Sequence, residues 1–149
     1  MRAVVQRVSR AKVTFNGEIT GEIGRGLLVL LGVTHADNEK DADYLADKIV
    51  NLRIFDGGDG KMNLSLAKID GELLVVSQFT LYGDTRRGRR PSFIAAAPGG
   101  EALHWYEYFV AEANERVKKV ATGRFGEMME VELTGDGPVT IILNSEKTI

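Results

Sequence analysis

GLLVLLGV, residues 26–33, and ELLVVSQFTLY, residues 72–82, are the two stretches that decide the fold. The first stretch is apolar throughout, and the second is apolar from Leu73 to Val76, after which polar side chains enter. A short apolar run bounded by glycine is typical of a strand that is covered on both faces of a sheet. We therefore predict two central strands in one sheet.

The segments outside these strands predict how the sheet is completed. Residues 3–20 alternate polar and apolar side chains on both sides of Asn16-Gly17, and Asn-Gly between alternating runs is a strong hairpin signal. Near the other end, EMMEVEL (127–133) and VTIIL (139–143) flank the segment TGDGP (134–138) and predict two closing strands. The sheet should hold about six strands in all.

Two segments have the spacing of amphipathic helices. Asp37 or Asn38 can cap the first, whose inward stripe recurs every three or four positions at Ala42, Leu45, Ile49 and Leu52. The second is expected from Glu101 to Val120, ending before Gly123. Together with the strands, they predict a single α+β domain over residues 1–149, with a mixed or antiparallel sheet curled toward a barrel.

Composition restricts the classes of function. The 19 Lys plus Arg against 21 Asp plus Glu give a net charge of -2, so any contact with RNA must be a local patch. The chain has no cysteine, which excludes disulfides, thiolate nucleophiles and cysteine-based zinc sites. Residues 1–15 lack the apolar core of a signal peptide, and no apolar run approaches the roughly 18 residues that span a bilayer. We expect a cytoplasmic protein without a membrane partner.

SQFT, residues 77–80, breaks the apolar pattern where the second central strand enters a long loop over residues 83–100. Functional sites often gather at strand ends beside loops. Strand alternation would place Gln78 and Thr80 on one face and Ser77 and Phe79 on the other, unless a bulge intervenes. The hydroxyl groups either belong to a site or only satisfy backbone groups at the strand end.

Familiar catalytic signatures are missing from the chain. There is no G-x-S-x-G elbow, no H-E-x-x-H, no Walker A loop and no G-x-G-x-x-G after a strand. Thr80 as a nucleophile would need a base, and the only histidines, His35 and His104, lie far from it along the chain. No group of His, Asp or Glu has trustworthy ligand spacing, so we predict no metal and no cofactor.

LYGDTRRGRRPSF, residues 81–93, holds four arginines within five positions. They are Arg86, Arg87, Arg89 and Arg90. Such a cluster suits a polyphosphate chain and predicts a salt-sensitive contact with an RNA backbone. The alternative is an ordinary run of solvated charge.

Several segments together resemble the D-aminoacyl-tRNA deacylase family, and the resemblance runs essentially from end to end. They are MRAVVQRVSRAKVT, GRGLLVLLGVTH, LRIF, DGKMNLSL, SQFTLYGDTRRGRRPSF and DGPVT. SQFT and Gly137-Pro138 are the diagnostic pair. The resemblance implies a homodimer that hydrolyses the ester of D-aminoacyl-tRNA, and of glycyl-tRNA, at active sites on the subunit interface. It also implies a cis Gly-Pro bond, although an X-Pro bond is trans by default.

The resemblance further implies how the site works. Rigid backbone at Gly137-Pro138 would hold the substrate amino group in the partner's site and exclude an L side chain. Backbone amides near SQFT would hold the ester carbonyl while the ribose 2′-hydroxyl helps to activate water, so Ser77, Gln78, Phe79 and Thr80 shape the site. Arg7 is expected to hold the Gly-Pro loop. Phe125 and Met129 are expected to contact the terminal adenine of aminoacyl-tRNA.

One position departs from the family pattern. Gly135 stands where Asn usually precedes Asp-Gly-Pro, and we expect a looser turn with weaker rejection of L-amino acids. Two other functions stay open: a non-catalytic RNA-binding dimer, favoured by the arginines and the missing base, and a purely structural dimer. The net charge weakens the first, and the polar break in a core strand weakens the second. Turnover of aminoacyl-tRNA would exclude both.

Overall fold

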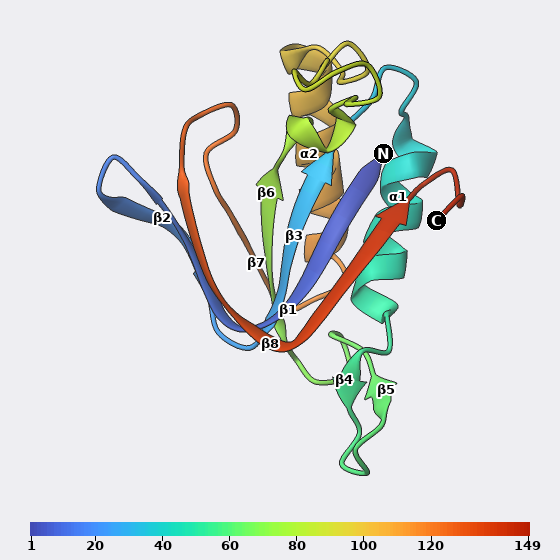
Figure 1. Cartoon of the computed structure of the whole chain (residues 1–149). Coiled ribbons are helices and arrows are strands. Elements are labelled where there is room, and N and C mark those ends of the chain that lie inside the picture. Colours follow the sequence, from blue (N-terminus) through green and yellow to red (C-terminus); the bar gives the residue numbers. More distant parts are fainter.

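A six-stranded mixed sheet forms the centre of the protein in this computed structural model, which describes residues 1–149 (Figure 1). Its strands are β1 (Arg2–Phe15), β2 (Glu18–Ile23), β3 (Gly26–Gly32), β6 (Glu72–Ser77), β7 (Lys119–Thr122) and β8 (Glu130–Asn144). Their order is β2-β1-β3-β6-β7, and β8 pairs with β1. A separate small hairpin consists of β4 (Phe55–Asp56) and β5 (Met62–Leu64).

The length of β1 makes the sheet curl. The strand pairs antiparallel with β3 over residues 2–8, with β2 over residues 11–15, and with β8 along nearly its whole length. The first half of β1 lies beside β3 and its second half lies beside β2, and these two parts of the sheet point in different directions. β1 and β8 therefore bend sharply together, as Figure 1 shows. β3, β6 and β7 run parallel to one another. The expected curled sheet is confirmed, and of the two alternatives, mixed or antiparallel, it is mixed. The hairpin at Asn16-Gly17 is confirmed as well.

Two helices cover one face of the sheet. They are α1 (Glu39–Asn51) and α2 (Gly99–Asn114). Of the two expected caps of α1, the Asn38 side chain accepts a bond from the Lys40 amide, and Asp41 completes a capping box. Ala42, Leu45 and Ile49 are buried as predicted, whereas Leu52 is only half-buried. Neither helix combines the length and apolar character that crossing a membrane requires.

The core lies on both sides of β3 and β6, as predicted for central strands. A large cluster joins Leu27, Val29 and Leu31 to the two helices. A smaller cluster inside the curl of the sheet contains Leu28 and Leu74. Burying apolar side chains on both faces explains why these two strands are apolar without alternation.

Three predicted boundaries were wrong. The second central strand ends at Ser77, and residues 79–82 form a short 3-10 turn, η1 (Phe79–Tyr82). The second helix ends at Asn114 rather than Val120, and the Arg116 amide bonds only three residues back, to the Ala113 carbonyl, which tightens the last turn. The chain then forms β7, since KVAT is partly β-branched and the far edge of β6 is open for pairing.

The third correction concerns the end of the chain. Residues 130–144 form one strand, not two strands that flank a turn, and residues 127–129 precede it. β1 is long enough to pair with both halves of β8, so the TGDGP segment becomes a bend with register shifts near Val8 instead of a reversal. Gly137-Pro138 therefore lies inside β8, where the pairing with β1 is interrupted near Val8.

Candidate functional site

The carboxyl ends of the three parallel strands meet at one edge of the sheet. Leu31 of β3 lies beside Ser77 of β6, and Val75 of β6 lies beside Thr122 of β7. Three segments leave this edge together, beginning at Val33, Gln78 and Gly123. In sheets with parallel strands, ligands commonly bind outside such ends. This edge, the carboxyl edge, is therefore the candidate position for a site.

SQFT forms the turn that leaves β6 at the carboxyl edge. The Gln78 amide still donates to the Leu31 carbonyl at 2.8 Å, and η1 begins at the next residue. The Gln78 side-chain amide donates to the Thr80 hydroxyl. The ring of Phe79 is 54% exposed and contacts Phe93 edge to face, with centroids 5.1 Å apart. The turn thus brings polar groups together at a surface with exposed aromatic rings.

No histidine accompanies Thr80. His35 binds the carbonyl of Ile94 through Nε2 at 2.7 Å, and His104 meets Trp105 edge to face with ring centroids 4.5 Å apart. The Thr80 hydroxyl accepts from Gln78 instead. A Thr-His nucleophile pair is therefore absent from this arrangement.

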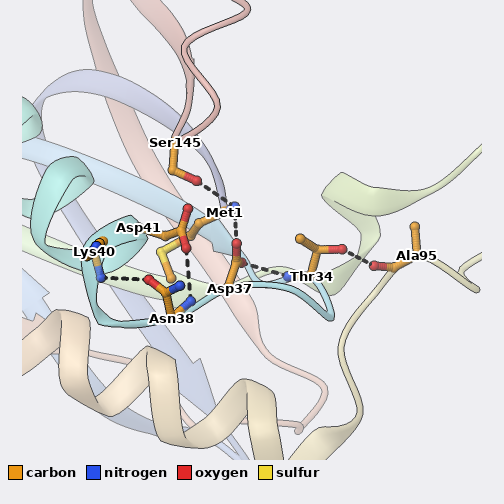
Figure 2. A network of polar contacts seen from close by, with 8 residues as sticks. All are labelled: Met1, Thr34, Asp37, Asn38, Lys40, Asp41, Ala95 and Ser145. Atoms are coloured by element: carbon orange, nitrogen blue, oxygen red, sulfur yellow. Dashed lines mark hydrogen bonds and ion pairs between the residues drawn. The ribbon is translucent and has the colours of Figure 1, made fainter.

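A hydrogen-bonded network ties the long loop to the end of β3. Thr34 donates from Oγ1 to the Ala95 carbonyl at 2.5 Å, and the Ala97 amide donates to the Val33 carbonyl at 2.9 Å. Figure 2 shows how the network continues inward: Asp37 accepts from the Thr34 amide at 2.8 Å and from the α-amino group of Met1 at 2.6 Å. This buried ion pair fixes the base of the loop that follows the SQFT turn.

The arginines lie in a tight loop closed by mutual backbone bonds between Asp84 and Ser92. The carboxylate of Asp84 accepts from the backbone amide and both guanidinium nitrogens of Arg86, at 3.0, 2.9 and 2.7 Å. These bonds from Arg86 hold the pKa of Asp84 below its ordinary value and raise the pKa of Arg86. The remaining three arginines are exposed and form no ion pair. They are Arg87, Arg89 and Arg90.

The Gly137-Pro138 bend lies near Arg7. The peptide is cis, both residues are exposed, and Gly137 has a φ of 133°. Arg7 donates from Nε to the Asp136 carbonyl at 3.0 Å and from Nη1 to the Ile54 carbonyl at 2.6 Å. A Cβ on Gly137 would lie 2.9 Å from the Val139 amide, so only glycine fits without strain. Arg7 thus fastens the bend to the body of the sheet.

A pocket of about 320 Å³ opens between α2 and the segment after β7, with Tyr106, Val110 and Phe125 in its lining. Phe125 packs against Tyr106 with ring centroids 5.6 Å apart. Met129 is half-buried, and its Sδ accepts from the Arg124 amide at 3.1 Å. A larger hollow of about 430 Å³ over β1, β2 and β8 has charges of both signs and includes none of the predicted site residues. The smaller pocket is the better candidate because it adjoins the carboxyl edge.

The model of the family described as D-Tyr-tRNA(Tyr) deacylase matches residues 4–144. The chain belongs to this family. A D-aminoacyl-tRNA deacylase of Clostridioides difficile is 60% identical over 99% of both chains. One of Thermus aquaticus is 58% identical over 99% of this chain and 97% of the relative.

Solved structures agree with the deacylase family fold. One described as c-Myc DNA Unwinding Element Binding Protein superposes with a TM-score of 0.92 at 41% identity, covering 97% of this chain and 98% of its own. A second, described as a probable eukaryotic D-amino acid tRNA deacylase, has a TM-score of 0.82 over 96% of this chain and 98% of its own. At 17% identity this second likeness supports the fold alone.

Within one chain of this deacylase family member, the two diagnostic motifs lie far apart. Arg2 of β1 pairs with Gly32 beside the SQFT turn, whereas Arg7 pairs with Leu27 and holds the Gly137-Pro138 bend. Five residues of strand separate the two positions, which is roughly 16 Å. Figure 1 likewise shows η1 beyond the arrowhead of β3 and the bend of β8 at the opposite end of the sheet. A single chain does not bring the motifs into one site.

Sequence reasoning missed the residues that anchor the long loop. Thr34 was not singled out and Asp37 was expected only as a possible helix cap, yet both fix the chain beside the SQFT turn. The available signal was the three polar residues among Thr34 to Asp37 directly after an apolar strand, the same kind of break that singled out SQFT. Its partners, Met1 and Ala95, are too distant in sequence for that pattern to identify them.

Proposed function

We propose that this chain is a D-aminoacyl-tRNA deacylase, which hydrolyses the ester to free tRNA and a D-amino acid and so proofreads chirality in the cytoplasm. One observation carries the proposal: the SQFT turn is exposed at the carboxyl edge in a chain that is 60% identical, from end to end, to a D-aminoacyl-tRNA deacylase. The substrate is aminoacyl-tRNA, and the reaction is transfer of the aminoacyl group to water.

The SQFT turn supplies the oxyanion donors in this proposal. The first bond of the turn runs from the Leu81 amide to the Gln78 carbonyl at 3.2 Å, so the amides of Phe79 and Thr80 precede it. We assign these two amides to the ester carbonyl. A preorganised oxyanion donor is worth about 3 to 4 kcal/mol, and an aminoacyl ester is already reactive. The ribose 2′-hydroxyl then activates water, and the enzyme needs no strong base of its own.

Removing one amide tests this assignment. Phe79→Pro deletes the donor, and Gln78 already has the extended backbone (φ -142°, ψ 84°) that a following proline requires. We expect a loss in rate of about 100- to 1,000-fold, as for other lost oxyanion donors. Phe79→Ala is the matched control because it removes the same ring and keeps the amide. Equal losses in both variants would show that the ring matters and the amide does not.

Chiral selection is assigned to a homodimer in which the Gly137-Pro138 bend of one subunit reaches the SQFT turn of the other. The separation of the two motifs within one chain supports this arrangement. Leu133 and Ile142, which are 38% and 59% exposed, flank the bend and suit an interface. Rigid backbone at the bend holds the substrate amino group and leaves no room for an L side chain, whereas glycine, without a Cβ, is accepted.

The first experiment compares D-tyrosyl-, L-tyrosyl- and glycyl-tRNA as substrates of the purified protein, with chelator present. Loss of the D and glycyl esters while the L ester survives supports the activity and its chirality together. Cleavage of both tyrosyl esters would refute rejection by the bend. No cleavage of any ester would refute the enzymatic activity and favour a protein that binds nucleic acid without catalysis.

Mixing subunits tests the shared site. Gly137→Val damages the bend, and Phe79→Pro damages the turn, so each homodimer should be inactive. After unfolding and refolding together, half of the dimers are mixed and each has one intact site, which restores about a quarter of the wild-type rate. If the mixture stays inactive, each site is built within one subunit and the proposed arrangement is wrong.

Binding of the tRNA is assigned to the arginine loop and to the pocket beside Phe125. Arg87, Arg89 and Arg90 face solvent and are placed to meet phosphates, while Phe125 and Met129 are assigned to the terminal adenine. Replacing the three arginines with Gln should weaken binding and lower the slope of log K against log salt by about 2 to 3. Arg86→Gln is the matched control, since Asp84 already neutralises that guanidinium. An unchanged salt slope in the triple variant would contradict this role.

A non-catalytic nucleic-acid-binding dimer is the second candidate. The arginine loop favours it, as does the likeness to a structure described as c-Myc DNA Unwinding Element Binding Protein. Both candidates predict salt-sensitive binding, so binding alone does not separate them. Turnover of many molecules of D-aminoacyl-tRNA per subunit would exclude this second function.

A further inference from the structure

Two residues outside the proposed catalytic groups hold the SQFT turn in place. Arg2 donates from Nη1 to the Leu81 carbonyl at 2.8 Å, and its Cζ lies 4.4 Å from the centroid of the Tyr82 ring. On the neighbouring strand, a Cβ added to Gly32 would lie 3.1 Å from the Gln78 carbonyl oxygen and 3.1 Å from Leu81 Cβ. Arg2 and Gly32 are partners in the register of β1 and β3, so the turn rests on this pair.

The physical chemistry of a short turn explains why such support matters. A 3-10 turn of four residues forms few bonds of its own, and its last carbonyls have no donor within the turn. A guanidinium at that end satisfies the Leu81 carbonyl and complements the partial negative charge of the terminal carbonyl groups. Its contact with the face of the buried Tyr82 ring adds a cation–π attraction.

The support acts on the end of the turn opposite the proposed oxyanion donors. Gln78 is fixed by its bond to Leu31, and Leu81 and Tyr82 are fixed by Arg2, so Phe79 and Thr80 lie between two anchored points. Releasing the second anchor lets the turn rotate about the first. Donors that stabilise a transition state lose effect when they shift by even about 1 Å.

We propose that Arg2 is a positioning residue for ester hydrolysis: by binding the Leu81 carbonyl and the Tyr82 ring, it orients the Phe79 and Thr80 amides without touching the substrate. This inference rests on the proposed deacylase function. It predicts that Arg2 affects the rate of the bound complex, and not the affinity for tRNA. An exposed arginine that binds a phosphate would do the reverse.

The test compares Arg2→Ala and Arg2→Lys with a matched control, Arg25→Ala. Arg25 is also an exposed arginine with a cation–π contact, its Cζ being 5.4 Å from the Phe55 centroid, but it lies at the other end of β3. Single-turnover deacylation of D-tyrosyl-tRNA over a range of enzyme concentrations separates the maximal rate from the half-saturating concentration. We expect Arg2→Ala to lower the maximal rate about tenfold and leave half-saturation unchanged. Lysine, which keeps a donor and a cation, should restore part of the rate, and Arg25→Ala should change neither quantity.

Gly32→Ala provides an independent perturbation of the same turn. The added Cβ crowds the Gln78 carbonyl oxygen at the start of the turn, so the maximal rate should fall again while the half-saturating enzyme concentration stays unchanged. Hydrogen exchange gives a readout that does not depend on activity. The amides of Leu81 and Gly83, which donate to Gln78 and Thr80, should exchange faster in Arg2→Ala than in Arg25→Ala.

The outcomes separate cleanly. A raised half-saturation with an unchanged maximal rate would overturn the inference and make Arg2 a contact for the tRNA. Unchanged kinetics would also overturn it. If the wild-type protein hydrolyses no ester, the proposed function fails and this positioning role fails with it. Unaltered hydrogen exchange at Leu81 and Gly83 in Arg2→Ala would refute the anchoring itself.

Discussion

Asp37→Asn should strongly destabilise the fold, because it removes one charge from a buried ion pair. The carboxylate lies 2.6 Å from the Met1 amino group, and the exposed fractions of the two partners are 4% and 0%. Breaking a buried pair by removing one partner costs about 3 to 5 kcal/mol, since the other charge is left without compensation. The new amide can still accept from Thr34, and Ser145 Oγ still accepts from Met1 at 2.9 Å. We therefore expect the free energy of unfolding to fall by the lower end of this range, about 3 kcal/mol.

Urea denaturation at one fixed protein concentration measures this effect, because the proposed association of two subunits would make stability depend on protein concentration. With a slope near 2 kcal/mol/M, a loss of 3 kcal/mol moves the midpoint down by about 1.5 M. Asp47→Asn is the control: Asp47 is an exposed carboxylate on α1, and its replacement should change stability by no more than about 0.5 kcal/mol. A loss below about 1 kcal/mol in Asp37→Asn would refute the reasoning, because the pair would then contribute no more than a surface salt bridge.

Three further predictions follow from the site and the core. Thr80→Ala should keep the deacylation rate within about threefold, since the hydroxyl only accepts from Gln78, and a rate loss above about 100-fold would make Thr80 a catalytic group. Gly135→Asn should raise the preference for D- over L-tyrosyl-tRNA, because the Asn side chain braces the bend. A Cβ at this position meets nothing within 4 Å, so the variant should fold normally. An unchanged ratio of D to L hydrolysis would therefore refute the bracing. Burial raises the pKa of Tyr106 to about 12, so the folded protein keeps a proton that the unfolded chain loses near pH 10. Stability should therefore be insensitive to this group below about pH 9 and fall by at most about 2.7 kcal/mol between pH 10 and 12. Tyr106→Phe should make that alkaline fall shallower in urea titrations, and an equally steep fall would contradict the assignment.

Local pattern was enough for the elements whose partners are close in sequence or whose surroundings are uniform. The hairpin at Asn16-Gly17, the buried strand 26–32 and an α1 cap at Asp37 or Asn38 all follow from side chains two to four positions apart, and the structure selects Asn38 as the cap. The same holds for the segment SQFT, because its polar residues interrupt an apolar run. Each of these signals is contained in a window of a few residues.

The predicted boundaries of helices and strands were wrong where a segment distant in sequence decided the structure. The helical spacing continues to Val117, but β6 offers an open edge that draws residues 119–122 into the sheet. TGDGP has the composition of a turn, but β1 is long enough to hold both sides of it in one strand. In each case the local preference amounts to a few tenths of a kcal/mol per residue, and strand pairing with a distant partner outweighs it.

The sequence by itself determined a single α+β domain, the family to which the chain belongs, and the segments in which a site should lie. Only the tertiary structure decided how those segments are placed. It placed Arg2 against Leu81, 79 positions along the chain, and Arg7 against Asp136, 129 positions along, and it put SQFT and Gly137-Pro138 at opposite ends of the sheet. The physical reason is that side-chain periodicity records burial within one element, whereas hydrogen bonds between elements depend on the curl of the whole sheet.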